Sequence, residues 1–255
     1  MSERIVCWFS CGVASAVATK LAIVNNAGKL PLVIARCVVR EEHPDNERFA
    51  KECEAWFGQP ILNLINEEHN GSVYSVIAKT KLTATVHGYA PCTNILKKDL
   101  RLSFQQPEDI HVFGYTLEEA DRLDRFIDAN NVQVWSVLIE NNLTHEDCMA
   151  LVEKQGIELP TMYKLGYEHN NCIGCSKANG AGYWNMIRRD FGEQFKTWAE
   201  LSRSIGSKMT RVNNVRIYLD ELPENYGDYS TEPKVQCGIF CEMANDALTP
   251  PKEQP

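Results

Sequence analysis

The sequence has no apolar run of the roughly 20 residues that a membrane-spanning helix needs. It has no excess of positive charge either. The formal net charge is −8 at pH 7, which argues against broad binding to a nucleic-acid backbone, although a local basic patch would permit it. Residues 1–6 lack the charged-then-apolar layout of a secretory signal, and no segment repeats. These absences predict a cytoplasmic protein with no membrane contact and with a small anionic partner.

Strand-like and helix-like segments alternate over most of the chain. Apolar, β-rich segments predict strands at 4–9, 31–39, 60–65, 110–115 and 132–139. Helical spacing predicts helices at 13–24, 46–57, 92–104, 117–129 and 144–155. This order indicates an α/β fold, with a Rossmann-like, mostly parallel five-stranded sheet, helices on both faces and ligands at the carboxyl ends of the strands.

A change of composition after about residue 165 predicts a second part of the chain. We expect an α/β domain at 1–165, a smaller Cys-rich C-terminal module at 166–245 and a disordered tail at 246–255. The module contains a helical stretch at 184–205 and a strand-like one at 215–219.

The small-residue loop after the first strand is the first candidate site. It reads Ser10-Cys11-Gly12-Val13-Ala14-Ser15 and opens the helix at 13–24. Backbone N–H groups and the positive end of a helix hold a phosphate or sulfate at such a turn, and small residues let the backbone come close. The alternative is an ordinary strand-to-helix turn with a capping serine.

Cys92 follows Pro91 at the start of the helix predicted at 92–104, which also carries Lys97, Lys98 and Arg101. A helix N-terminus and nearby cations lower the pKa of a thiol, so Cys92 is a candidate catalytic thiolate. Lys97 and Arg101 are four residues apart, hence on one helix face, which suits binding of the phosphate oxygens of a nucleotide. The alternative is a buried Cys92 beside a solvated row of cations.

Four of the ten cysteines lie in two short spacings near the C-terminus. Cys172-x-x-Cys175 forms a chelating loop with Gly174 in its turn, and Cys237 and Cys241 supply a second pair. Cysteines without an export signal stay reduced, so four thiolates predict a tetrahedral zinc site or an iron–sulfur cluster of the 4Fe-4S type. A dithiol redox pair and inert cysteines are the alternatives.

The loop and its flanks, residues 8–18, resemble a variant of the Ser-Gly-Gly-x-Asp-Ser loop of the PP-loop superfamily. Cys11 stands at the first Gly of that pattern and Ala14 at its Asp. Three further segments extend the resemblance over about residues 4–245 to the phosphoadenosine phosphosulfate (PAPS) reductase family. They are His43-Pro44-Asp45 with Arg48-Phe49, Pro91-Cys92-Thr93 with Leu96-Lys97-Lys98, and Asn171-Cys172-Ile173-Gly174-Cys175.

This resemblance implies an oxidoreductase of sulfur metabolism that binds an adenine sulfonucleotide at the PP-loop and uses thiol or cluster-assisted chemistry. The missing Asp favours a nucleotide handled without cleavage of Mg-ATP. Gln236-Cys237-Gly238-Ile239 resembles the family's ending with its nucleophilic cysteine, so Cys237 is either a metal ligand or the catalytic nucleophile. A thiol or a redox protein would then donate electrons, and a homodimer stays open.

Two other functions stay open. One is a PP-loop ATP-dependent sulfurtransferase that acts on a nucleic-acid base or a nucleotide and releases pyrophosphate. The other is a non-catalytic nucleotide sensor whose cysteine module holds structural zinc.

Overall fold

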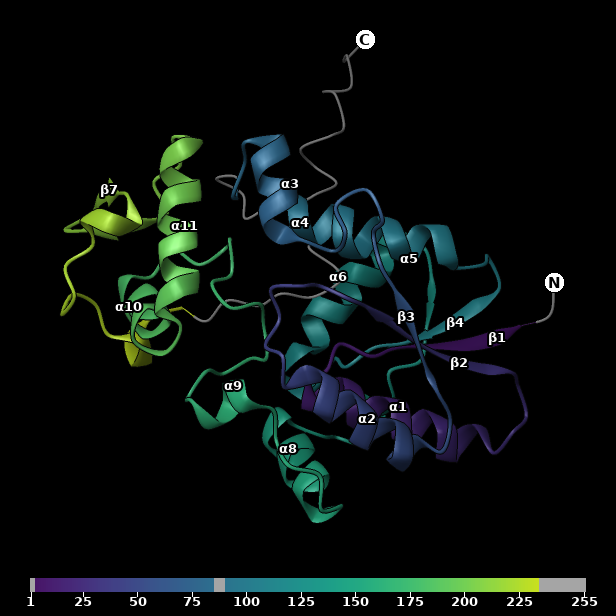
Figure 1. The fold of residues 1–255 in the computed structure, drawn as a ribbon. Coiled ribbons are helices and arrows are strands. Elements are labelled where there is room, and N and C mark those ends of the chain that lie inside the picture. The colour runs from purple at the N-terminus through teal and green to yellow at the C-terminus, as the bar shows by residue number, and fades with distance from the viewer. Residues whose placement is uncertain (1–2, 85–89, 234–255) are drawn as a thin grey trace, which may run out of the picture. The chain divides into compact units, whose positions relative to one another are not determined.

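The computed structural model describes residues 3–84 and 90–233, which form two compact units (Figure 1). Among these residues, unit 1 comprises 3–38, 44–65 and 99–170, and unit 2 comprises 39–43, 66–84, 90–98 and 171–233. Unit 2 thus takes up segments from within 1–165. The domain limits at 1–165 and 166–245 stay predictions, and the tail at 246–255 lies outside the described residues.

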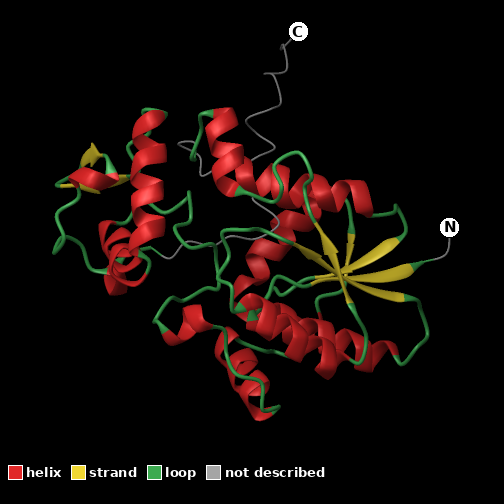
Figure 2. Ribbon diagram, in the orientation of Figure 1, coloured by secondary structure: helices red, strands yellow, loops and turns green. Residues whose placement is uncertain are grey.

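Unit 1 is an α/β unit with a five-stranded parallel sheet, as predicted. The strands are β1 (Arg4–Trp8), β2 (Leu32–Cys37), β3 (Ile61–Leu64), β4 (Asp109–Val112) and β5 (Gln133–Val134). Their order in the sheet is β3-β2-β1-β4-β5. Helices α1 (Val13–Asn26) and α2 (Asn46–Phe57) lie on one face, and α5 (Asp99–Phe104) and α6 (Ala120–Asn130) on the other (Figure 2). This arrangement is Rossmann-like.

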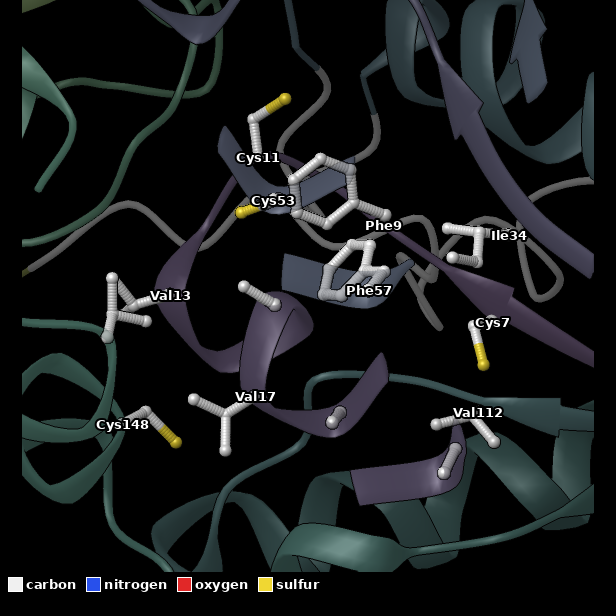
Figure 3. Close-up of a cluster of buried hydrophobic side chains, with 14 of the residues drawn as sticks. Cys7, Phe9, Cys11, Val13, Val17, Ile34, Cys53, Phe57, Val112 and Cys148 are labelled. Carbon is white, nitrogen blue, oxygen red and sulfur yellow. The ribbon is translucent and has the colours of Figure 1, made fainter. Parts of the chain in front are cut away.

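The alternation of side chains along β1 supplies both faces of the sheet. Ile5, Cys7 and Phe9 point into the core under α1 and α2, and Figure 3 shows part of this cluster. The ring of Phe9 lies 6.1 Å from that of Phe49 and 5.7 Å from that of Phe57, both on α2. Because these aromatic rings bury large apolar areas, α2 is held on the sheet by packing more than by helix propensity.

The opposite face carries a second aromatic layer. The indole nitrogen of Trp8 donates a hydrogen bond to Nδ1 of His111 at 3.0 Å, and the Trp8 ring lies edge-on to Phe104 of α5. Phe113, just after β4, packs edge-on against Phe126 of α6. The sheet is therefore covered on both sides, as a parallel sheet requires.

Several helix ends occur where the sequence predicts them. Helix α2 stops at Gly58, whose φ of 76° is a conformation that glycine adopts without strain. Helix α8 (His145–Lys154) begins after Thr144, which forms a capping box with Asp147. Helix α9 (Thr161–Lys164) follows in the same unit.

The prediction of a strand at 132–139 is wrong over the second half of that range. Strand β5 covers two residues, and α7 (Val137–Glu140) follows it as a helical turn. Val137 and Leu138 are fully buried in that turn. A short buried apolar run has the same pattern in a strand and in a helix, so periodicity does not separate the two.

Unit 2 contains α3 (Val73–Thr80), α4 (Pro91–Thr93) with a π-helical segment at Asn94–Lys98, α10 (Ala181–Asp190) and α11 (Gly192–Ser204). The helical stretch predicted at 184–205 consists of two helices that meet at Phe191. Strands β6 (Thr210–Val212) and β7 (Val215–Ile217) pair antiparallel, and β7 lies within the strand predicted at 215–219. Within the described ranges, no helix is long and apolar enough to span a bilayer.

Candidate nucleotide-binding loop and cysteine hook

The loop after β1 lies at the topological switch point of the sheet. The chain passes from β1 through α1 to β2 on one side, whereas β4 pairs with β1 on the other and α6 covers the opposite face. Ligands of open α/β sheets bind at this point, beyond the carboxyl ends of the strands. The loop at 10–12 therefore occupies the position that the predicted role requires. Gly114, just after β4, lies against the backbone of Ser15 in the first turn of α1.

Cys11 adopts a glycine-like backbone conformation, with φ of 58°. This is the position at which the resembling loop pattern has glycine. Its side chain is fully buried, and its sulfur lies 3.8 Å from the carbonyl oxygen of Asn46. The contact with α2 accounts for a non-glycine residue in this conformation, because burial of the thiol offsets the backbone strain.

The two serines shape the loop from inside. The hydroxyl of Ser15 donates to the carbonyl oxygen of Gly12 at 2.8 Å and accepts from the backbone N–H of Ser10 at 3.0 Å. The Ser10 hydroxyl donates to it at 3.1 Å. With one donated and two accepted bonds, the Ser15 hydroxyl has no remaining donor for a ligand. The donors suited to an anion are instead the N–H groups of Ala14 and Ser15 in the first turn of α1, which have no acceptor within the helix.

Two residues that the sequence patterns did not single out hold this loop in place. The side-chain amide of Asn170 donates to the carbonyl oxygen of Cys11 and to Oδ1 of Asn46, both at 2.8 Å. The phenol oxygen of Tyr163 accepts from the backbone N–H groups of Val13 and Asn170, and burial raises the pKa of Tyr163 to about 12. Asn170 and Cys11 are 159 residues apart, so no local spacing signals their contact.

A charged clamp supports the same part of unit 1. Arg48 and Asp45, from the motif after β2, form a two-pronged ion pair with distances of 2.7 and 2.9 Å. This pair holds the pKa of the Asp45 carboxyl well below its usual range. Asp45 also accepts from the backbone N–H of Thr161, and Arg48 donates to the carbonyl oxygen of Leu159. The motif thus ties α2 to the chain segment that carries Tyr163.

Lys97 and Arg101, the predicted phosphate ligands, belong to different units. In unit 2, Lys97 is buried and its ammonium lies 3.3 Å from the carboxylate of Glu42. In unit 1, Arg101 is fully buried and donates to Gln105 and Asn130. Arg101 therefore has a structural role between α5 and α6, and binding of a nucleotide by either cation stays a prediction.

Cys92 is the most accessible thiol among the eight described cysteines. It is half-buried, whereas the other seven are buried. Burial raises the pKa of Cys53 and of Cys148 to about 12, which keeps both thiols protonated. The Cys92 sulfur lies 3.4 Å from the hydroxyl oxygen of Ser176, the residue after Cys175. Its predicted catalytic role is therefore compatible with access by a substrate.

The Cys172–Cys175 hook is buried and held by its neighbours. Its turn contains Gly174, with φ of 74°. The indole of Trp198 donates to the carbonyl oxygen of Ile173 at 3.1 Å, and the N–H of Cys175 donates to the phenol oxygen of Tyr183 at 2.8 Å. These two hydrogen bonds hold the backbone of the hook.

The hook fits one half of a four-thiolate site. The other predicted ligands, Cys237 and Cys241, lie outside the described residues. Within residues 3–84 and 90–233, no three His, Cys, Asp or Glu side chains come together as a metal site. The metal and its identity therefore stay predictions.

Comparisons with known proteins do not assign the chain. No family model matches it, and no curated protein matches it. The likeness to the PP-loop superfamily and to PAPS reductases therefore stays a resemblance carried by the quoted motifs.

Proposed function

We propose that this protein is a PAPS-reductase-like enzyme that binds an adenine sulfonucleotide at the loop of residues 10–15. The position of that loop at the switch point of a Rossmann-like sheet carries the proposal. The sulfate or phosphate group would lie at the first turn of α1, where backbone N–H groups of Ala14 and Ser15 favour an anion.

The chemistry is a transfer of the sulfonyl group to a thiolate. The thiolate sulfur attacks the sulfate sulfur, the bond from that sulfur to the phosphate oxygen breaks, and the nucleotide leaves with the electron pair. A second thiol then attacks the resulting thiosulfonate, which releases sulfite and leaves a disulfide. A dithiol or a redox protein reduces that disulfide with two electrons. Cys92, which is half-buried, and Cys237 are the candidates for the nucleophile.

If Cys92 is the nucleophile, Cys172 and Cys175 would hold a zinc ion or an iron–sulfur cluster together with Cys237 and Cys241. When bound, either group would hold its ligating cysteines in the thiolate form. Hydrogen bonds from Trp198 to Ile173 and from the backbone N–H of Cys175 to Tyr183 hold the backbone of the hook.

The test is binding of AMP and of adenosine 5′-phosphosulfate by calorimetry, with sulfite release measured in the presence of a dithiol. The double variant Ser10→Ala with Ser15→Ala removes the hydroxyls that shape the loop, so we expect at least a tenfold loss of affinity for both nucleotides. Ser103→Ala is the matched control, because that hydroxyl also bonds a backbone carbonyl in unit 1, away from the loop. Unchanged affinity in the double variant would refute the proposal. Pyrophosphate release from ATP would select the sulfurtransferase instead.

A nucleotide sensor with structural zinc is the second candidate, and the state of the hook favours it. Both sulfurs are buried, as in sites that only stabilise a fold. Metal and acid-labile sulfide analysis of protein purified without oxygen separates the two. Iron with sulfide, lost in Cys172→Ser, supports the enzyme. One zinc per chain with no sulfite release supports the sensor.

A further inference from the structure

Two neighbouring residues in unit 1 each carry a buried polar atom without a partner in the described part of the chain. These atoms are Nε2 of His169 and Oδ1 of Asn170. The Asn170 side chain is 8% exposed. Since buried polar atoms are nearly always hydrogen-bonded, two such atoms side by side in the sequence point to a missing partner.

The contacts of Asn170 place it at the nucleotide-binding loop and settle the orientation of its amide. Its nitrogen faces two acceptors, the carbonyl oxygen of Cys11 and Oδ1 of Asn46. Because both partners accept hydrogen bonds, the amide group that faces them must be the NH2 of Asn170. The oxygen that remains accepts hydrogen bonds and does not donate them.

His169 directly precedes Asn170, and its imidazole has neighbours from other segments of unit 1. Its ring stands 5.9 Å from that of His145, which in turn lies 5.7 Å from the ring of Tyr163. The phenol oxygen of Tyr163 accepts from the backbone N–H of Val13 at the start of α1. Glu119, just before α6, and Arg122 of α6 are close enough to act on it electrostatically. The contacts of Asn170 with Cys11 and of Tyr163 with Val13 thus put His169 next to residues that hold the loop after β1, where the ligand is expected.

We propose that His169 and Asn170 recognise the neutral part of the nucleotide, its base or its sugar, and not its phosphate. This inference rests on the proposed function. A phosphate oxygen only accepts hydrogen bonds, so it would repel Oδ1 of Asn170. The ligand group there has to donate. An adenine edge offers an amine donor beside a ring-nitrogen acceptor, and a ribose offers hydroxyls that do both.

The imidazole suits the same task because either ring nitrogen carries the proton. As a donor, Nε2 of His169 complements a ring nitrogen of the base, and as an acceptor it complements a sugar hydroxyl. The phosphate would meanwhile lie at the first turn of α1. The loop would thus bind the anionic part of the nucleotide, and His169 and Asn170 would bind its neutral part.

The test is calorimetric titration of wild type, His169→Ala, His169→Gln and His145→Ala with AMP, ribose 5-phosphate and inorganic phosphate. We expect His169→Ala to weaken AMP binding about tenfold, the effect of one lost hydrogen bond, with inorganic phosphate unchanged. His169→Gln keeps a side-chain donor and acceptor, so it restores part of the affinity and excludes a mere folding defect. His145→Ala is the matched control, an imidazole of the same cluster, and it keeps wild-type affinity.

The ribose 5-phosphate titration distinguishes contact with the base from contact with the sugar. If His169→Ala leaves that ligand unchanged, the pair contacts the base. If it weakens ribose 5-phosphate as much as AMP, the pair contacts the sugar. The inference is overturned if His169→Ala binds AMP like the wild type, or if it weakens inorganic phosphate as much as AMP. A wild type that binds no nucleotide refutes the proposed function, and this inference with it.

Discussion

Gly114 lies directly on the backbone of Ser15. A Cβ atom on residue 114 would come within 2.6 Å of the Ser15 backbone nitrogen and 2.9 Å of the Ala14 carbonyl carbon. Backbone atoms cannot relieve such a clash by a change of rotamer, as the end of a flexible side chain can. The chain after β4 and the first turn of α1 are therefore in contact that only glycine permits, at the point where a nucleotide is expected.

Gly114→Ala should lower the free energy of unfolding by about 1–3 kcal/mol, because the added methyl group forces the two backbone segments apart. The measurement is urea unfolding followed by tryptophan fluorescence. Gly192→Ala is the matched control, since a Cβ on residue 192 meets no atom within 4 Å. Equal unfolding midpoints for Gly114→Ala and wild type would show that the contact is looser than described.

Acid should destabilise unit 1 through His111. Burial first, and then the charge of Arg101, lower the pKa of His111 from 6.5 to about 4. The unfolded chain takes up a proton near pH 6.5, whereas the folded imidazole resists protonation until about pH 4. The stability that neutral His111 contributes is thus complete above pH 6.5 and is lost as the pH falls to 4, by about 2–3 kcal/mol.

The measurement is the urea midpoint at pH 7.5, 5.5 and 4.5 for wild type and His111→Gln. The variant loses the bond from Trp8 and starts less stable, but its midpoint should fall less between pH 7.5 and 4.5. Parallel curves for wild type and His111→Gln would show that another group controls acid stability.

Gly174 should tolerate no side chain. A Cβ on residue 174 would lie 2.2 Å from Nε1 of Trp198, and its φ of 74° adds backbone strain. Gly206→Ala measures the effect of backbone strain without a steric clash, because Gly206 has φ of 71° and an added Cβ would meet no atom within 4 Å. We expect a loss of about 1 kcal/mol for Gly206→Ala and about 3 kcal/mol for Gly174→Ala in thermal unfolding. Similar losses for both variants would mean that Trp198 yields to the methyl group.

Glu232 should stabilise α10 through its carboxylate. The carboxylate accepts from the backbone N–H of Gly182 at 2.6 Å and of Tyr183 at 2.9 Å. Glu232→Gln removes the charge from a helix N-terminus, so we expect a loss of about 1 kcal/mol at low salt and less at high salt. Glu193→Gln in the first turn of α11 is the control, because that exposed carboxylate pairs with Lys196. An effect of Glu193→Gln as large as that of Glu232→Gln would contradict the assignment.

The regular elements of unit 1 were predictable where local signals agree. The predicted range 46–57 matches α2, because apolar residues recur at helical spacing and Gly58 ends the helix. The segment 132–139 shows the limit of such patterns. Val137 and Leu138 are buried whether the backbone is extended or helical, and the sheet leaves β5 only two residues.

The candidate site was likewise predictable only in part. The loop at 10–15 was predictable, since a turn of small residues between a strand and a helix is a local pattern. Its supports were not. Tyr163 and Asn170 carry no motif of their own, and Asn170 meets Cys11 across 159 residues. The helical pattern also did not reveal that Arg101 is fully buried, because a cation on a helix is usually solvated.

The sequence alone predicted the order of strands and helices in unit 1, and with it a parallel sheet whose candidate ligand loop follows the first strand. It did so because hydrophobic periodicity, capping residues and turn residues act over a few neighbours. The fold was needed to show which polar atoms of the loop are already paired, that Lys97 and Arg101 are buried, and where His169 and Asn170 lie. Those outcomes depend on contacts between residues far apart in the chain, and no local pattern specifies the partner of a polar atom.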